Sequence, residues 1–94
     1  MSYTESFTAA LSELRGLRLP EDIERHATTL LQSIEHAAIA LQNGGAERPL
    51  WESKGRATGY ALGLKDGHRL DGSACARLTE VFRSYVEAVE EVPH

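Results

Sequence analysis

The sequence predicts an all-α protein, a small antiparallel bundle of about four helices in which a short N-terminal helix precedes three longer ones. Apolar residues recur at intervals of three and four along most of the chain, and no run alternates apolar and polar residues for long enough to form a strand. Glycine and proline residues separate the periodic segments. With 94 residues the chain is expected to form a single domain, residues 1–94, because a second core would have too little surface left to bury.

Composition narrows the class of protein further. Hydrophobic residues at 41% and charged residues at 26% are typical of a globular protein in water, and they exclude a fully disordered or membrane-embedded chain. A lone cysteine excludes an intrachain disulfide and a cysteine zinc cluster, and the first residues lack the basic start and apolar run of a secretory signal. We therefore expect a cytoplasmic protein that does not enter the membrane.

The first helix is expected over roughly residues 4–15. Ser2 and Glu5 have the spacing of a capping box, and Gly16 is a natural stop. The apolar positions of this helix are Tyr3, Phe7, Leu11 and Leu14. This apolar stripe is short, so the helix needs neighbours to be stable.

The second helix is expected from Pro20 to about Gln42. Proline suits the first turn of a helix, and the acidic residues that follow it are favoured by the helix dipole. The helix is expected to end at residues 43–45, where the sequence Asn-Gly-Gly is typical of a closing turn. Its core seam alternates steps of four and three: Ile23, Ala27, Leu30, Ile34, Ala37 and Leu41. Residues 37–41 are apolar all round, so we expect this stretch to be covered on more than one side.

The third helix, expected over residues 50–64, carries the least ordinary pattern in the chain. Gly55, Gly59 and Gly63 recur every four residues, which places them on one helical face. Each glycine in a helix interior costs about 0.5–1 kcal/mol relative to alanine. The opposite flank offers an ordinary core face made of Leu50, Ala57, Ala61 and Leu64.

Three interpretations of the glycine stripe follow. The stripe packs on the alanines of the second helix (Ala37, Ala38, Ala40) within the monomer, or it meets a second copy or another protein, or the helix breaks at Gly59 or Gly63. We expect Trp51 to be partly buried beside the stripe. The candidate protein-interface residues are Trp51, Gly55, Arg56, Gly59, Tyr60 and Gly63.

The fourth helix is expected from about Gly72 to Glu91. Asp71 is a good N-cap, and Leu70 is placed to pack on Cys75 as a hydrophobic staple. The seam is Cys75, Leu78, Phe82, Tyr85, Val89 and Val92, and Pro93 ends the helix. Because Cys75 lies on this seam, we expect it to be buried and unreactive.

The sequence offers no recognisable catalytic, cofactor or metal grouping. No two of the four histidines have the i, i+4 spacing that would put two imidazoles on one helical face. Residues 66–72 superficially resemble a calcium loop, but Leu70 stands where an oxygen ligand is needed. The glycine spacing matches neither the dinucleotide fingerprint nor the P-loop. We therefore expect a protein that is not an enzyme and that needs no cofactor.

One segment is locally basic although the whole chain has a net charge of −4. Between residues 48 and 69 the basic side chains are Arg48, Lys54, Arg56, Lys65 and Arg69, against Glu52 and Asp66. Our main hypothesis is a small regulatory or adaptor protein that binds another protein as a homodimer, for example an inhibitor that masks a surface of a larger regulator. The alternative is a nucleic-acid-associated module that uses this basic segment, which the overall negative charge disfavours.

Overall fold

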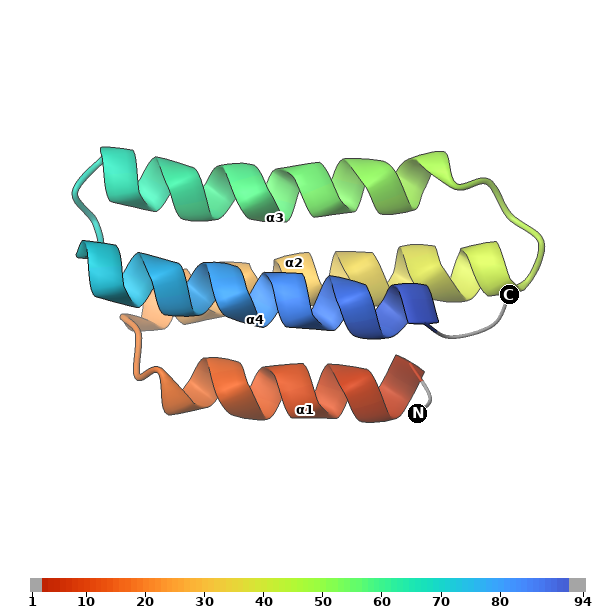
Figure 1. The fold of residues 1–94 in the computed structure, drawn as a ribbon, viewed down its shortest axis with the longest axis horizontal. Coiled ribbons are helices and arrows are strands. Elements are labelled where there is room, and N and C mark those ends of the chain that lie inside the picture. Colours follow the sequence, from red (N-terminus) through yellow and green to blue (C-terminus); the bar gives the residue numbers. More distant parts are fainter. Residues whose placement is uncertain (1–2, 92–94) are drawn as a thin grey trace.

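The computed structural model describes residues 3–91, and the side chains from Glu5 onward. The described chain folds into four α-helices and contains no strand, which confirms the all-α prediction (Figure 1). The helices are α1 (Tyr3–Gly16), α2 (Glu21–Gln42), α3 (Arg48–Asp66) and α4 (Gly72–Glu91). They lie along the long dimension of a molecule that measures 40 × 23 × 19 Å.

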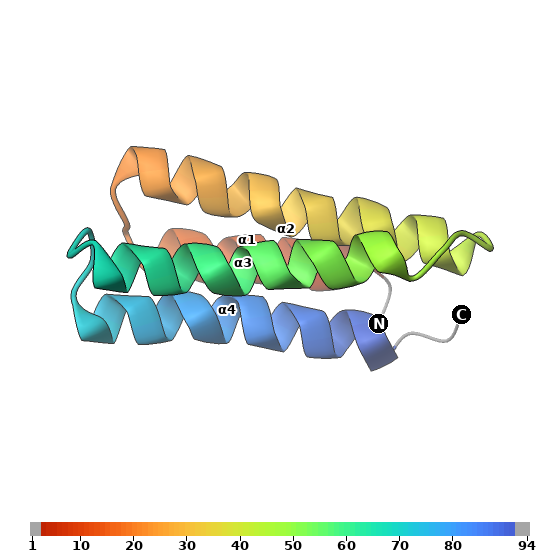
Figure 2. The same ribbon diagram turned by 90° about the horizontal axis from the view of Figure 1, so that it is seen from above.

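The four helices form an up-down-up-down bundle (Figures 1 and 2). Each helix packs against its neighbours in sequence, and α1 also packs against α4. Across the diagonal, α2 meets α4 over a narrower contact, whereas within the described residues α1 and α3 do not touch. Helix α3 therefore lies at a corner of the bundle, with α2 and α4 on one side and an opposite side that no helix in the described part of the chain covers.

The core consists mainly of the seams predicted for α2 and α4. Ile23, Ala27, Ile34, Leu78 and Val89 are each 1% exposed or less. Leu41 at the end of the α2 seam is half-buried, and the predicted seam residue Val92 lies outside the described residues. The expectation that residues 37–41 are covered on more than one side is wrong, because Ile39 and Ala40 are exposed.

The helix ends follow the local chemistry of the sequence. Pro20 directly precedes α2, and its carbonyl accepts a hydrogen bond from the Glu24 amide at 2.9 Å. After α2 the chain turns through Gly44, whose φ of 91° is a conformation that glycine adopts without strain. Helix α3 is two residues longer at each end than predicted. At its start, Pro49 occupies the first turn, where its missing N–H costs nothing. The capping box predicted at Ser2 lies outside the described residues.

The start of α4 is capped as predicted. The carboxylate of Asp71 accepts a hydrogen bond from the Ala74 amide at 2.7 Å. Leu70, the residue before the cap, is half-buried against the core cluster that contains Cys75. The cap and the staple together fix the direction in which α4 leaves the α3–α4 turn.

Removing this cap should destabilise the protein measurably. We expect Asp71→Ala to lower the free energy of unfolding by about 1 kcal/mol, because one amide at the helix N-terminus loses its acceptor. Asp71→Ser, which retains a capping oxygen, should lose only a small part of this stability. Urea denaturation of the three proteins measures the effect, and equal losses in both variants would show that the hydrogen bond is not the cause.

Candidate protein-interaction surface

The glycine stripe of α3 faces solvent. Gly55, Gly59 and Gly63 are all exposed, and they lie on one continuous helix, so the predicted break at Gly59 or Gly63 is wrong. A Cβ atom added at any of the three would find no neighbouring group within 4 Å. The predicted packing of the stripe on the alanines at 37, 38 and 40 is therefore also wrong.

The reason lies in the opposite flank of the same helix. Leu50, Ala57, Ala61 and Leu64 form the buried side of α3 as predicted, together with Ser53. At 3.6 residues per turn, Gly55 and Gly59 lie about 160° around the helix from Ala57. Because α2 and α4 both pack on the Ala57 side, the glycines must point away from the bundle.

Trp51 and Leu62 are exposed on the same outward side of α3. Trp51 is 63% exposed and Leu62 is 57% exposed, so the expectation of a partly buried Trp51 is wrong. The Lys54 Nζ atom lies 4.5 Å from the centre of the Trp51 ring, a cation–π contact. Lys54 also forms an ion pair with Glu90 of α4, which holds its ammonium group near the indole.

We call this surface the outer face of α3. It includes the exposed residues Trp51, Gly55, Thr58, Gly59 and Leu62, and the exposed charged residues Arg48, Glu52 and Asp66 lie on the same side of the helix. Arg56 and Gly63 are exposed at its edge on the α2 side. The sequence interpretation missed Thr58 and Leu62, although Leu62 follows Trp51 by eleven residues, which is about three helical turns and returns to the same side.

Tyr60 is not on the outer face. Its ring stacks on His26 of α2 with a centroid separation of 4.3 Å and an interplanar angle of 22°. Burial raises the pKa of the Tyr60 hydroxyl, and the negative charge of Asp22 adds to the effect. Among the predicted interface residues, the structure thus brings together Trp51, Gly55 and Gly59 and places Tyr60 against a neighbouring helix.

An ion pair next to Tyr60 ties the α3–α4 turn to the start of α2. Arg69 donates a hydrogen bond to the Asp22 carboxylate at 2.7 Å, and this bond lowers the pKa of Asp22. Both side chains are more than half exposed, so the pair contributes little stability. A hydrogen bond from Arg83 likewise lowers the pKa of Glu80 on the surface of α4.

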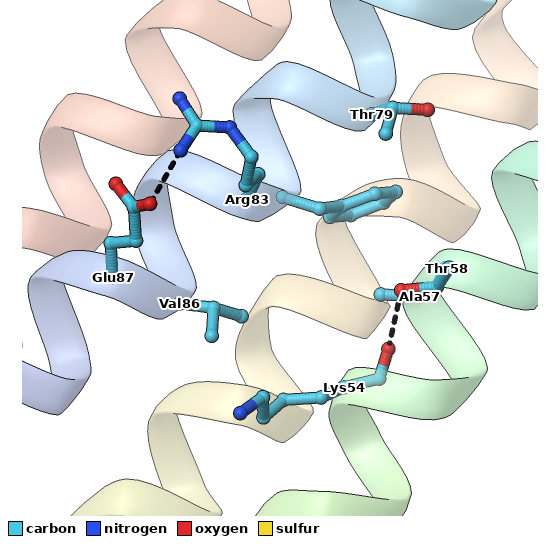
Figure 3. A pocket seen from close by; sticks show the side chains of 8 residues that line it. Lys54, Ala57, Thr58, Thr79, Arg83, Val86 and Glu87 are labelled. Atoms are coloured by element: carbon cyan, nitrogen blue, oxygen red, sulfur yellow. Dashed lines mark hydrogen bonds and ion pairs between the residues drawn. The ribbon is translucent and has the colours of Figure 1, made fainter.

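A furrow runs between α3 and α4 beside the outer face (Figure 3). One cavity of about 230 Å³ is lined by Lys54, Ala57, Thr58, Thr79, Phe82, Arg83, Val86 and Glu87. A second, of about 400 Å³, shares Thr58 and Thr79 with the first and continues past Leu62 toward Gly72. Its lining includes the small side chains of Ala61 and Ala76. We call these two cavities the α3–α4 furrow.

The polar groups that line the furrow lie mostly at its rim. Its polar lining consists of threonine hydroxyls and charged side chains at the rim, and Arg83 is already paired with Glu80 and Glu87. Within residues 3–91, no three His, Cys, Asp or Glu side chains converge to hold a metal ion. Cys75 is 4% exposed, and its thiol donates a hydrogen bond to the Ala61 carbonyl at 3.3 Å, which confirms the predicted burial.

The basic side chains of the 48–69 segment do not gather on one face. Arg48 pairs with Glu52 at 3.0 Å, and Lys54 and Arg69 pair with acidic residues of α4 and α2. Lys54 and Arg56 lie on opposite flanks of α3, because two residues along the helix correspond to a rotation that leaves them about 160° apart. The local excess of positive charge is thus largely neutralised and spread around the helix.

Comparison of the sequence and the structure with known proteins identifies no similar protein. The chain matches no family model, no curated protein and no solved structure. None of the helices in the described part of the chain combines the length and the apolar character required to span a bilayer.

Proposed function

We propose that this protein is a non-enzymatic regulatory or adaptor protein that acts in the cytoplasm by binding another protein through the outer face of α3. The observation that carries the proposal is the exposure of Trp51 and Leu62 along the same side of a ridge without side chains. Exposed aromatic and aliphatic groups that flank a smooth surface are typical of protein-binding sites.

The energetic cost of the ridge supports this proposal. The three glycines cost about 1.5–3 kcal/mol in total relative to alanine. A domain has only about 5–15 kcal/mol of stability, and no close contact with the described residues 3–91 compensates for the loss. Close approach of another helix backbone would compensate for it, because small residues at intervals of four allow two helices to pack closely.

A protein of this kind would act by occupying a surface. A single uncovered helix face can pair with a helix of a larger regulator and thereby block that helix from its other partners. The apolar lining of the α3–α4 furrow extends the contact area next to Leu62. An inhibitor that masks an assembly surface, and that pairs with a second copy when its target is absent, fits these features.

The alternative function, association with nucleic acid, is less well supported. Three of the five basic side chains in the 48–69 segment are paired with carboxylates, and the rest do not form a continuous patch. A salt titration separates the two functions. Binding to phosphates should weaken steeply between low and physiological salt, whereas an apolar helix interface should hardly respond.

Site-specific crosslinking in the cell tests the proposal. A photoreactive benzophenone amino acid is placed at position 62 on the outer face or, as a matched control, at the exposed position 32 on α2. We expect covalent adducts with a polypeptide from position 62 and none from position 32. Adducts from neither position, or the same adducts from both, would contradict a specific binding face on α3.

A further inference from the structure

We propose that the outer face of α3 binds the α3 helix of a second copy, antiparallel, about a two-fold axis at the level of Ala57. This inference rests on the proposed function and names the partner of the same surface. In such a pair, a residue that lies a given number of positions before Ala57 meets the residue that lies the same number of positions after it on the partner.

The glycines meet at the centre of this pair. Gly55 lies two residues before Ala57 and Gly59 lies two residues after it. The register therefore sets Gly55 of each copy against Gly59 of the partner subunit. Neither glycine has a neighbour within 4 Å in the monomer, so the two backbones can approach closely without displacing any side chain.

The two exposed apolar side chains meet next to the glycines. Trp51 lies six residues before Ala57 and Leu62 lies five residues after it. The two also lie on the same side of α3, about 20° apart around the helix. Each Trp51 ring therefore lies beside Leu62 of the partner subunit. The two-fold axis relates two equivalent copies of this contact.

Charges at the ends of α3 select the antiparallel direction. Arg48 lies nine residues before Ala57 and Asp66 lies nine residues after it. Asp66 of the partner subunit would therefore join the ion pair that Arg48 makes with Glu52 of its own helix at 3.0 Å. Arg48 and Asp66 both lie on the far side of α3 from Ala57, about 180° around the helix. A parallel pair would place like charges together at both ends instead. Arg56 lies near the axis, at the edge of the outer face on the α2 side.

The interface offered by one helix and its margins is small, so the dimer should be weak. Interfaces of less than about 1,200 Å² belong to transient complexes. We therefore expect dissociation in roughly the micromolar range, where the protein exchanges between a second copy and any other helix that fits the same face. Such exchange would make the outer face available to a target when the target is present.

Light scattering and sedimentation measure the dimer directly. At high micromolar concentration we expect twice the monomer mass for the wild type and the monomer mass for Gly59→Leu. The Gly59→Leu variant should keep its helical circular dichroism and its cooperative melting, because the added side chain enters open space. Emission from Trp51, the single tryptophan, should shift to shorter wavelength as the concentration rises, and only in the wild type. A monomeric wild type, or a dimer that Gly59→Leu leaves intact, would overturn the inference.

Charge reversal tests the register. Arg48→Asp and Asp66→Arg should each weaken the dimer several-fold. The double variant should recover part of the loss, because the cross-helix charge pair is restored while the Arg48–Glu52 pair stays broken. Arg77→Asp on α4, which changes the net charge by the same amount as Arg48→Asp, should have little effect. Failure of the double variant to recover would overturn the antiparallel register. A monomer that still forms crosslinked adducts with a different protein from position 62 would refute this inference while leaving the proposed function intact.

Discussion

Replacing Leu64 by alanine is expected to lower the free energy of unfolding by about 2–4 kcal/mol. Leu62→Ala, two residues away in the same helix, should change it by less than about 0.5 kcal/mol. Leu64 is 6% exposed and belongs to the core, whereas Leu62 is 57% exposed on the outer face. The first variant removes apolar contacts and leaves a cavity, and the second removes a group that already faces water.

Urea denaturation at low protein concentration measures both changes without a contribution from self-association. The two variants contain the same substitution in the same helix, so their difference reports burial alone and not helix propensity. An equal loss of stability in both would mean that Leu62 is packed inside the monomer. The outer face would then not be a free surface, and the proposed function would lose its basis.

The pair also illustrates what periodicity can predict. Leu50, Ala57, Ala61 and Leu64 recur at helical intervals, so the buried side of α3 follows from the hydrophobic effect on one helix. The bounds of α4 follow equally from local chemistry, because Asp71 caps its start. The positions of the helices and their buried sides can therefore be predicted from short-range patterns in the sequence.

The direction in which the glycine stripe points could not be predicted in this way. Glycine has no side chain whose transfer from water would favour one direction, so the stripe is compatible with both a close helix contact and open solvent. The outcome depends on which helices occupy the neighbouring corners of the bundle. Because both neighbours of α3, α2 and α4, pack on its Ala57 side, no described helix covers the side that carries Gly59.

The candidate site was predictable only in part for the same reason. Trp51 was placed near the stripe by its position on the helix, but its exposure depends on the absence of a covering element. Tyr60 is adjacent to Gly59 in sequence, yet one residue rotates it by about 100° toward His26 of α2. Leu62 could have been placed on this surface from its eleven-residue spacing to Trp51, whereas the furrow beside Leu62 and Thr58 is a property of two helices together.

Replacing all three stripe glycines by alanine is expected to stabilise the protein by about 1.5–3 kcal/mol. Each position lies in a helix, and a Cβ atom there meets no neighbouring group within 4 Å. The variant keeps the native contacts and reduces the conformational freedom of the unfolded chain. Thermal unfolding at low concentration should show the melting temperature raised by roughly 10 °C, since each 1 kcal/mol shifts it by about 4–8 °C in a domain of this size.

Gly45→Ala is the matched control for this variant. A Cβ atom at Gly45 would lie 2.7 Å from the Ala40 carbonyl oxygen, so the turn after α2 must shift to accept it. We expect this variant to lose about 1–3 kcal/mol of stability. If the triple alanine variant were destabilised in the same way, the glycine stripe would be packed against something within the monomer, contrary to the structure.

The triple variant also separates a structural explanation of the stripe from a functional one. Three added methyl groups hold two α3 backbones apart, so the variant should self-associate less than the wild type although each monomer is more stable. A stripe with no binding role would instead give a more stable monomer and leave self-association unchanged. Greater stability together with weaker association would mean that the glycines lower the stability of α3 in the monomer and at the same time allow the contact between two α3 helices.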